Sequence, residues 1–317
     1  MPLVKHSSCK VNLLLNILGK RPDGFHELET VIHPVHLHDS LTFERQGANI
    51  RLVCNDPLLP INGKNLVFAA AERFLKAAGI SEGVRIHLEK RIPIAAGLGG
   101  GSGNAATTLL ALNELFGHPL DADVLGKLAA ALGSDVPFFL QSRPALATGR
   151  GEIIAPLDFF PALAGCWLVL VHPGFGVSTA WAYQQLARHP ECLHGKPGRA
   201  QHLISLLQTA DLPAAGREFY NSFQAPVLGK YPLLALFQEF FREHGAGTAL
   251  MSGSGSSTFA LADSSDTAGS LLEKFQARFG PQFWSALVKL GAGEGPGAPA
   301  GRAGADFGLQ SQAGELI

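Results

Sequence analysis

A glycine-rich segment between an apolar strand and an apolar helix constrains this chain more than any other stretch. Five glycines fall between Gly97 and Gly103, and the helical run that follows opens at Asn104. Glycine lets the backbone turn its N–H groups toward a ligand, and a helix N-terminus adds unpaired donors and a positive dipole end. The pattern predicts a phosphate-binding loop, and a flexible linker or a tight turn is the alternative interpretation.

The common glycine motifs do not fit this segment. No G-x-G-x-x-G register can be laid on residues 97–103, which excludes the dinucleotide-binding fingerprint. The chain contains neither the Gly-Lys-Ser/Thr of a P-loop nor the H-R-D of the protein-kinase catalytic loop. If this segment binds a nucleotide, the fold is therefore not one of the three that these motifs identify.

The pattern P-x-x-x-G-L-G-G-G-S-x-N-A-A, which begins at Pro93, resembles the ATP-phosphate loop of the GHMP kinase superfamily. Its three consecutive glycines and Asn-Ala-Ala-Thr are most similar to the 4-diphosphocytidyl-2-C-methyl-D-erythritol kinases of the non-mevalonate isoprenoid pathway. The resemblance implies ATP and Mg²⁺ as cofactors, with Ser102 as a contact of the ion. The ATP-binding residues that it implies are Asn65, Pro93, Gly97, Leu98, Gly99, Gly100, Gly101, Ser102, Gly103 and Asn104.

Two further segments carry the residues that the resemblance makes catalytic. The strand-like run KVNLLLNIL places Lys10 and Asn12 on one face, and this family opens with such a Lys-x-Asn strand. Asp135 lies in the turn Gly-Ser-Asp-Val-Pro, where the family has its proposed base. A carboxylate there can take the proton of an attacking hydroxyl, and Lys10 beside it can stabilise the transferred phosphoryl group. Without the resemblance, Lys10 would be a solvated strand-end lysine and Asp135 a cap.

The turn Arg-Pro-Asp-Gly-Phe-His is typical of the diphosphocytidyl kinases. The resemblance implies that Phe25 stacks on one face of the cytosine, that His26 bonds its edge, and that Tyr183 closes the other face. It also makes Asn12 and Thr179 substrate-binding residues. Base stacking on an aromatic ring contributes about 1–3 kcal/mol. The alternatives are a hairpin-end Phe25 packed on the core and a Tyr183 that serves helix packing.

Two other groups of polar residues have simpler explanations. His33, His36 and His38 share one strand and could suggest a metal site, but no second ligand cluster completes it. We expect them to be surface or partly buried strand residues. Asn65 is a natural N-cap for a helix up to residue 78, so the cap explains it without the adenine contact that the family implies.

Composition limits the remaining possibilities. The chain has 317 residues, 46% of them hydrophobic, and a formal net charge of -1, which gives no electrostatic case for nucleic acid or a membrane surface. Its four cysteines form no C-x-x-C pair and suit a reducing cytosol. We find no signal peptide and no apolar run long enough for a membrane helix, and expect a cytoplasmic monomer or weak homodimer.

The expected fold is α+β with two domains, as the resemblance implies. An N-terminal ATP-binding domain, similar to ribosomal protein S5 and containing a left-handed β-α-β unit, would span residues 1–155. A ferredoxin-like C-terminal domain would span 156–290, and 291–317 would be a disordered Gly/Ala/Pro-rich tail. The loop 252–256 (Ser-Gly-Ser-Gly-Ser) matches a third family motif and would pack against the phosphate loop.

Three departures from the family pattern stand out. Gly103 replaces a serine, so one contact with phosphate or magnesium is expected to be missing; Phe25 replaces the common tyrosine; and the chain extends past the usual family end.

The expected reaction is ATP-dependent phosphorylation of the 2-hydroxyl of 4-diphosphocytidyl-2-C-methyl-D-erythritol, a small-molecule substrate. One alternative is another GHMP kinase, of the mevalonate or homoserine type, whose substrate has no base to stack on Phe25. A second is a nucleotide-binding sensor without catalysis, which would need neither Lys10 nor Asp135.

Overall fold

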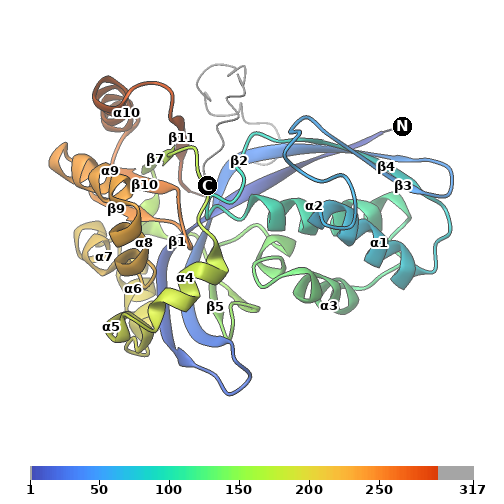
Figure 1. Cartoon of the computed structure of the whole chain (residues 1–317), viewed down its shortest axis with the longest axis horizontal. Coiled ribbons are helices and arrows are strands. Elements are labelled where there is room, and N and C mark those ends of the chain that lie inside the picture. Colours follow the sequence, from blue (N-terminus) through green and yellow to red (C-terminus); the bar gives the residue numbers. More distant parts are fainter. Residues whose placement is uncertain (1, 292–317) are drawn as a thin grey trace, which may run out of the picture.

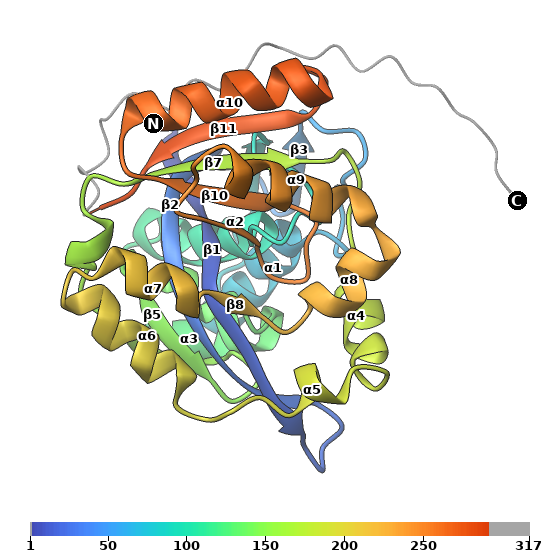
Figure 2. The same ribbon diagram turned by 90° about the vertical axis from the view of Figure 1, so that its left-hand side faces the viewer.

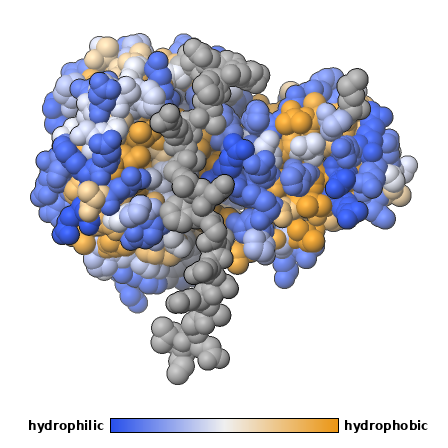
Figure 3. All heavy atoms as spheres, turned by 90° about the horizontal axis from the view of Figure 1, so that it is seen from above, coloured by the Kyte–Doolittle hydropathy of each residue, from blue (hydrophilic) through white to orange (hydrophobic). Residues whose placement is uncertain are grey.

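The computed structural model describes residues 2–291 and has two lobes that share a pair of long strands (Figure 1). The N-terminal lobe carries a seven-stranded sheet and three α-helices, and the C-terminal lobe carries a four-stranded sheet with helices on its outer side. The α+β class expected from the sequence is confirmed. Seen from above, the surface is mostly hydrophilic with scattered apolar patches (Figure 3).

The seven-stranded sheet is built on one long antiparallel pair. Its strands are β1 (Leu3–Lys20), β2 (His26–Arg45), β3 (Ile50–Cys54), β4 (Val84–Glu89), β5 (Ala145–Thr148), β6 (Ile153–Pro156) and β8 (Tyr220–Asn221). The order is β3-β4-β2-β1-β8, and β5 pairs with β2 and β6. Strands β1 and β2 pair from Leu3 opposite Phe43 to Lys20 opposite His26, with three register shifts. These shifts let two unusually long strands bend and serve both lobes.

Three α-helices and a short 3-10 helix pack on the N-terminal sheet. They are α1 (Leu66–Ala78), α2 (Gly100–Leu115), α3 (Ala122–Leu132) and η1 (Pro137–Leu140). The Asn65 side chain caps α1 by accepting from Val67 N–H, and Gly79 ends it in the left-handed region, with φ 64°. Asp121 caps α3 in the same way. Their apolar sides bury Phe43, Phe74 and Phe138 in one core.

The four-stranded sheet has the antiparallel order β11-β7-β10-β9. Its strands are β7 (Trp167–His172), β9 (Thr248–Met251), β10 (Thr258–Ala262) and β11 (Trp284–Lys289). Helices α9 (Pro232–Glu243) and α10 (Ser265–Phe279) lie over its outer face, where Phe237, Phe241 and Phe275 are buried against the strands (Figure 2). Strand order and direction are those of a ferredoxin-like sheet, as expected.

A second group of short helices lies between β6 and α9 in the chain. They are η2 (Pro161–Leu163), just before β7, and then α4 (Thr179–Leu186), α5 (Pro190–Leu193), α6 (Arg199–Gln208), α7 (Leu212–Glu218) and α8 (Gln224–Lys230). Of these, the sequence indicated only α4. The others are three to ten residues long, too short to show a clear apolar period.

The two lobes share one core. The inner face of the four-stranded sheet, with Leu168 and Phe259, packs in a single cluster with Val11 and Val31 of the long strands. Strand β8 also pairs in parallel with Leu14 and Leu15 of β1, so a segment of the expected C-terminal domain extends the N-terminal sheet. The division at residue 155 stays a prediction, as does the handedness of the β3–α1–β4 crossover.

Three sequence expectations can be compared with the fold. Helix α2 begins at Gly100 and not at Asn104, so most of the glycine segment is helical. His33 is buried and His36 and His38 are partly buried in β2, and no group of three or more metal-ligating side chains occurs among residues 2–291. The expected tail lies outside the described residues, apart from Gly291. No helix in this part of the chain is long and apolar enough to cross a membrane.

The buried histidine of β2 predicts how stability depends on pH. His33 Nδ1 lies 2.7 Å from the Pro34 carbonyl, and burial lowers the pKa of the imidazole to about 4. Protonation therefore favours the unfolded chain, so the stabilisation is complete above pH ~6.5 and is lost as the pH falls toward 4. In urea titrations, His33→Gln should make the free energy of unfolding less dependent on pH, by up to ~1.4 kcal/mol per unit below pH 6.

The exposed histidine of the neighbouring strand β4, in the variant His87→Gln, is the matched control. An equal slope in the wild type and in His33→Gln would contradict this assignment.

Candidate active site

A cleft of about 620 Å³ collects most of the residues that the sequence singled out. Its wall combines β1, the glycine segment and the turn after α3 with α4 and the loop between β9 and β10, so both lobes contribute. The predicted residues that line it are Lys10, Asn12, Asn65, Pro93, Gly97, Gly99, Gly100, Gly101, Ser102, Asn104, Asp135, Thr179 and Tyr183.

The glycine segment presents backbone donors at the start of α2. Gly99 precedes the helix with φ 70°, and the first intrahelical bond runs from Gly103 N–H to Gly99 O. The N–H groups of Gly100, Gly101 and Ser102 therefore have no acceptor within the helix. Together with the helix dipole, these donors form an anion-binding site on the cleft.

Two predicted members of this segment do not line the cleft. Leu98 is buried in the shared core, and its carbonyl accepts from Lys10 N–H. At Gly103 a Cβ would lie 2.6 Å from the Ser8 carbonyl oxygen, so a side chain here would meet β1. The phosphate contact expected to be missing without a serine at this position has no support in this geometry.

Lys10 is the centre of a group of polar contacts in the cleft. Its side chain is 4% exposed, and its Nζ donates to Asn12 Oδ1 at 2.6 Å and to the Gly97 carbonyl at 3.0 Å. Asp135 Oδ2 lies 3.7 Å from the same nitrogen, which is an ion pair but too long for a hydrogen bond. The Asp135 side chain is 44% exposed, so its carboxylate can still accept a bond from a ligand in the cleft.

The Ser-Gly-Ser loop between β9 and β10 packs on the glycine segment, as predicted. Ser252 Oγ donates to the Gly97 carbonyl at 2.9 Å, and Ser257 N–H donates to the Ala96 carbonyl at 3.0 Å. A Cβ on Gly97, whose φ is 77°, would lie 2.1 Å from the Ser252 carbonyl oxygen. Glycine is therefore required at Gly97 by packing as well as by backbone conformation.

Of the three residues expected to bind cytosine, only Tyr183 lines the cleft; His26 and Phe25 lie next to lining residues, Tyr183 and Arg150. The His26 and Tyr183 rings stack at a centroid distance of 4.7 Å, and Tyr183 also meets Phe223 edge to face at 4.8 Å. Phe25 is 52% exposed, and the Arg150 guanidinium lies 4.6 Å from its ring centroid. His26, and not Phe25, covers a face of Tyr183, so a base between Phe25 and Tyr183 requires His26 to turn away.

Burial sets the charge states of the two polar rings, His26 and Tyr183. It raises the pKa of the Tyr183 phenol to about 12, with a smaller contribution from Asp135. It also lowers the pKa of His26, with a smaller contribution from Lys20. Near neutral pH, His26 therefore carries one donor and one acceptor nitrogen, which suits the edge of a base.

A buried ion pair lies behind the glycine helix, and no sequence motif indicated it. Asp39 is fully buried; it pairs with Lys90 and also accepts from Asn104 Nδ2 at 2.9 Å and Ile92 N–H at 2.9 Å. Asn104 is thus held by the protein and does not cap the helix. Two other cleft residues, Arg150 and Phe223, were missed as well.

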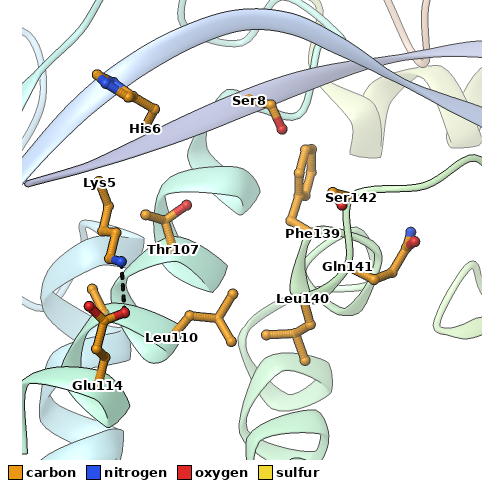
Figure 4. A pocket seen from close by; sticks show the side chains of 11 residues that line it. Lys5, His6, Ser8, Thr107, Leu110, Glu114, Phe139, Leu140, Gln141 and Ser142 are labelled. Atoms are coloured by element: carbon orange, nitrogen blue, oxygen red, sulfur yellow. Dashed lines mark ion pairs between the residues drawn. The ribbon is translucent and has the colours of Figure 1, made fainter. Parts of the chain in front are cut away.

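A second hollow, of about 410 Å³, is lined by Phe139 together with residues of β1 and α2 (Figure 4). Lys5 and Glu114 form a 2.7 Å ion pair at one end of it, while Leu110 and Leu140 face each other below the strand. None of the residues predicted to be functional lines it.

Known proteins match this chain along most of its length. Residues 65–143 match the N-terminal domain of the GHMP kinases, and residues 203–281 match their C-terminal domain. A 4-diphosphocytidyl-2-C-methyl-D-erythritol kinase of Synechococcus sp. (strain JA-2-3B'a(2-13)) is 38% identical over 283 residues, which cover 87% of this chain and 90% of that protein.

Two solved structures are also similar. A crystal structure of 4-(cytidine 5'-diphospho)-2C-methyl-D-erythritol kinase has a TM-score of 0.76 and 36% identity, and covers 91% of this chain and 100% of its own. The homoserine kinase of Cytophaga hutchinsonii has a TM-score of 0.69 over 91% of this chain and 94% of its own. At 20% identity, this second similarity concerns the fold alone.

The close contact at Gly97 yields a test of the phosphate loop. In Gly97→Ala the new methyl group would meet the Ser252 carbonyl, and alanine in the left-handed region costs about 1–2 kcal/mol in addition. We expect the affinity for ATP to fall by at least about tenfold. The readout is the ATP concentration that produces half of the maximal thermal stabilisation.

Gly126→Ala, within α3 and with nothing inside 4 Å of the new Cβ, is the control for the methyl group itself. Wild-type ATP affinity in Gly97→Ala would show that this contact does not shape the loop.

Proposed function

The chain belongs to the GHMP kinase family, among its 4-diphosphocytidyl-2-C-methyl-D-erythritol kinases, and on this basis we propose its reaction in detail. It transfers the γ-phosphoryl group of ATP to the 2-hydroxyl of 4-diphosphocytidyl-2-C-methyl-D-erythritol. One observation carries the proposal: Lys10 and Asp135 lie 3.7 Å apart beside the glycine helix, in a cleft that also holds Tyr183.

The start of α2 binds the phosphates of ATP in this proposal. The free N–H groups of Gly100, Gly101 and Ser102 face the cleft, and the smallness of Gly99 lets the phosphates approach the backbone. Leu66 and Pro60 line the wall beside Asn65, and we assign the adenine to them. Asn65 itself is occupied as the cap of α1 and as a donor to the Pro60 carbonyl.

A magnesium ion fits the oxygen groups near the phosphates. Ser102 offers a half-buried hydroxyl on the cleft, and Asp135 is the one acidic residue among the lining residues that the structure describes. Such a sparse set suits an ion held mainly by ATP itself. When bound, the ion neutralises part of the phosphate charge. We assign Ser102 as its protein ligand.

Asp135 acts as the base and Lys10 as its electrostatic partner. Asp135 accepts the proton of the acceptor hydroxyl as that oxygen bonds to the γ-phosphorus and the bond to ADP breaks. Lys10 is held by Asn12 and Gly97, so its charge is already in place and no reorganisation is needed during the reaction. Asn12 is fixed in turn by Thr30 Oγ1 at 2.8 Å.

The other end of the cleft holds the cytosine. Tyr183 and Phe25 stack on its two faces, and His26, turned away from Tyr183, bonds its edge. Thr179 is held at the same wall by Ser254, with 2.8 Å between their hydroxyl oxygens. The neutral imidazole of His26 matches an edge that presents both donors and acceptors.

This assignment favours the cytidyl substrate over the alternatives. Mevalonate and homoserine have no base to occupy the aromatic end, and a sensor has no use for the Lys10–Asp135 pair. A role in isoprenoid precursor synthesis and a cytoplasmic location remain predictions.

Replacing the base tests the chemistry. In Asp135→Asn the amide cannot accept the proton, so kcat for ADP release should fall by about 10²–10⁴-fold, while KM for both substrates changes little. Coupled ADP release is measured with 4-diphosphocytidyl-2-C-methyl-D-erythritol, mevalonate and homoserine. Asp123→Asn, at an exposed position in the first turn of α3, removes the same charge outside the cleft and should behave as the wild type.

Turnover of mevalonate or homoserine, but not of the cytidyl substrate, would sink the substrate assignment. Undiminished kcat in Asp135→Asn would remove Asp135 as the base.

Truncating Phe25 tests the base-binding end. The ring is half exposed, so Phe25→Ala should leave the melting temperature nearly unchanged. Losing one stacking partner should raise KM for the cytidyl substrate by about 5- to 100-fold and leave KM for ATP unchanged. Unchanged KM for the cytidyl substrate would show that Phe25 does not contact the base.

A further inference from the structure

The cleft is strongly positive, which matches two polyanionic substrates. Among residues 2–291, four basic residues line it, namely Lys10, Lys64, Lys90 and Arg150, against the single carboxylate of Asp135. ATP brings three phosphates, and the proposed acceptor brings a diphosphate between its cytidine and its methylerythritol. The diphosphate of the acceptor therefore needs a cation that does not serve ATP.

Three of the four cations lie away from the acceptor side or are held by other groups, whereas Arg150 pairs with Glu152 through its Nε. Lys90 is 6% exposed and pairs with the buried Asp39 behind the glycine helix. Lys10 is bonded to Asn12 and Gly97 beside the proposed base. Lys64 directly precedes the cap of α1, on the side assigned to adenine.

Arg150 lies on the acceptor side of the cleft. It sits in the turn between β5 and β6, and its guanidinium carbon is 4.6 Å from the centroid of the Phe25 ring. On the other side, a Cβ on Gly151 would lie 3.8 Å from Ser134 Cβ, so the same turn packs beside Ser134 and Asp135. Arg150 thus stands between the ring assigned to cytosine and the residue assigned to the reacting hydroxyl.

The turn fixes this arginine and leaves its outer nitrogens available. Arg150 N–H donates to Glu152 Oε2 at 2.6 Å, and its Nε donates to Glu152 Oε1 at 3.2 Å. Its two terminal nitrogens donate to no side chain or carbonyl within residues 2–291. They can offer the paired donors with which arginine binds phosphate oxygens.

We propose that Arg150 binds the diphosphate of the acceptor and so selects a nucleoside diphosphate over a nucleoside. This rests on the proposed function, because the chemical order of that substrate (cytosine, ribose, diphosphate, methylerythritol) places the diphosphate between Phe25 and Asp135. The guanidinium also lies over one face of the Phe25 ring, so the same residue contacts the ring assigned to cytosine and can bind the adjoining diphosphate.

The test compares CDP with cytidine as inhibitors competing with the acceptor in the ADP-release assay. In Arg150→Gln, the inhibition constant of CDP should rise by about 10- to 100-fold and that of cytidine by less than about threefold. Arg150→Lys keeps the charge without the paired donors and should fall between the two. KM for ATP should not change.

Two further variants separate charge recognition from a structural role. Phe25→Ala should weaken both CDP and cytidine, since the base whose stacking it removes is common to the two ligands. Arg143→Gln removes an exposed arginine that pairs with Asp158 outside the cleft, and should match the wild type.

The outcomes also distinguish this inference from the proposed function. Equal weakening of CDP and cytidine in Arg150→Gln, or no weakening of either, would overturn the role of Arg150 and leave the kinase assignment intact. A wild type that neither responds to CDP nor releases ADP with the cytidyl substrate would overturn both.

Discussion

The arrangement of the site depends on one backbone carbonyl, that of Gly97. It accepts from Lys10 Nζ at 3.0 Å and from Ser252 Oγ at 2.9 Å, so it joins β1, the glycine segment and the β9–β10 loop. These segments are 87 and 155 residues apart in the chain, yet one oxygen fixes their separation. The same contact positions the Lys10 ammonium, which faces the proposed base Asp135. A change in the packing of these segments would therefore also move this ammonium.

The glycines are needed for the close packing of these segments as well as for the proposed binding of phosphate. At Gly97 and Gly103 a Cβ would lie 2.1 and 2.6 Å from carbonyl oxygens of other segments, and at Gly99 it would lie 2.9 Å from the Phe139 ring. Helix α2 can begin at Gly100 because glycines in its first turn allow the helix to pack directly against β1. The Asp39–Lys90 pair supports this helix from behind, and burial of both charges is tolerable because further hydrogen bonds to Asp39 compensate for lost hydration.

The two lobes are bound together by continuous elements, which makes the cleft a defined site. Strands β1 and β2 pass from one lobe to the other, and β8 returns from the second lobe to pair with β1. Asn221 of β8 then donates to the Met251 and Gly253 carbonyls at 2.7 Å, holding the loop that lines the cleft. The proposed phosphate and cytosine ends of the site are thereby kept at a fixed distance along the same strands.

By itself the sequence determined the motifs that carry the chemistry and most elements near them. A cap followed by an amphipathic run places α1 at Leu66–Ala78, because such signals act within a few residues. The start of α2 was misplaced by four residues because glycine disfavours helix locally, while packing against β1 requires it. Only the tertiary structure brought Asp39 to Lys90 and Arg150 to Phe25. Those contacts join distant segments, and their geometry follows from how the sheets and helices pack, which no local pattern encodes.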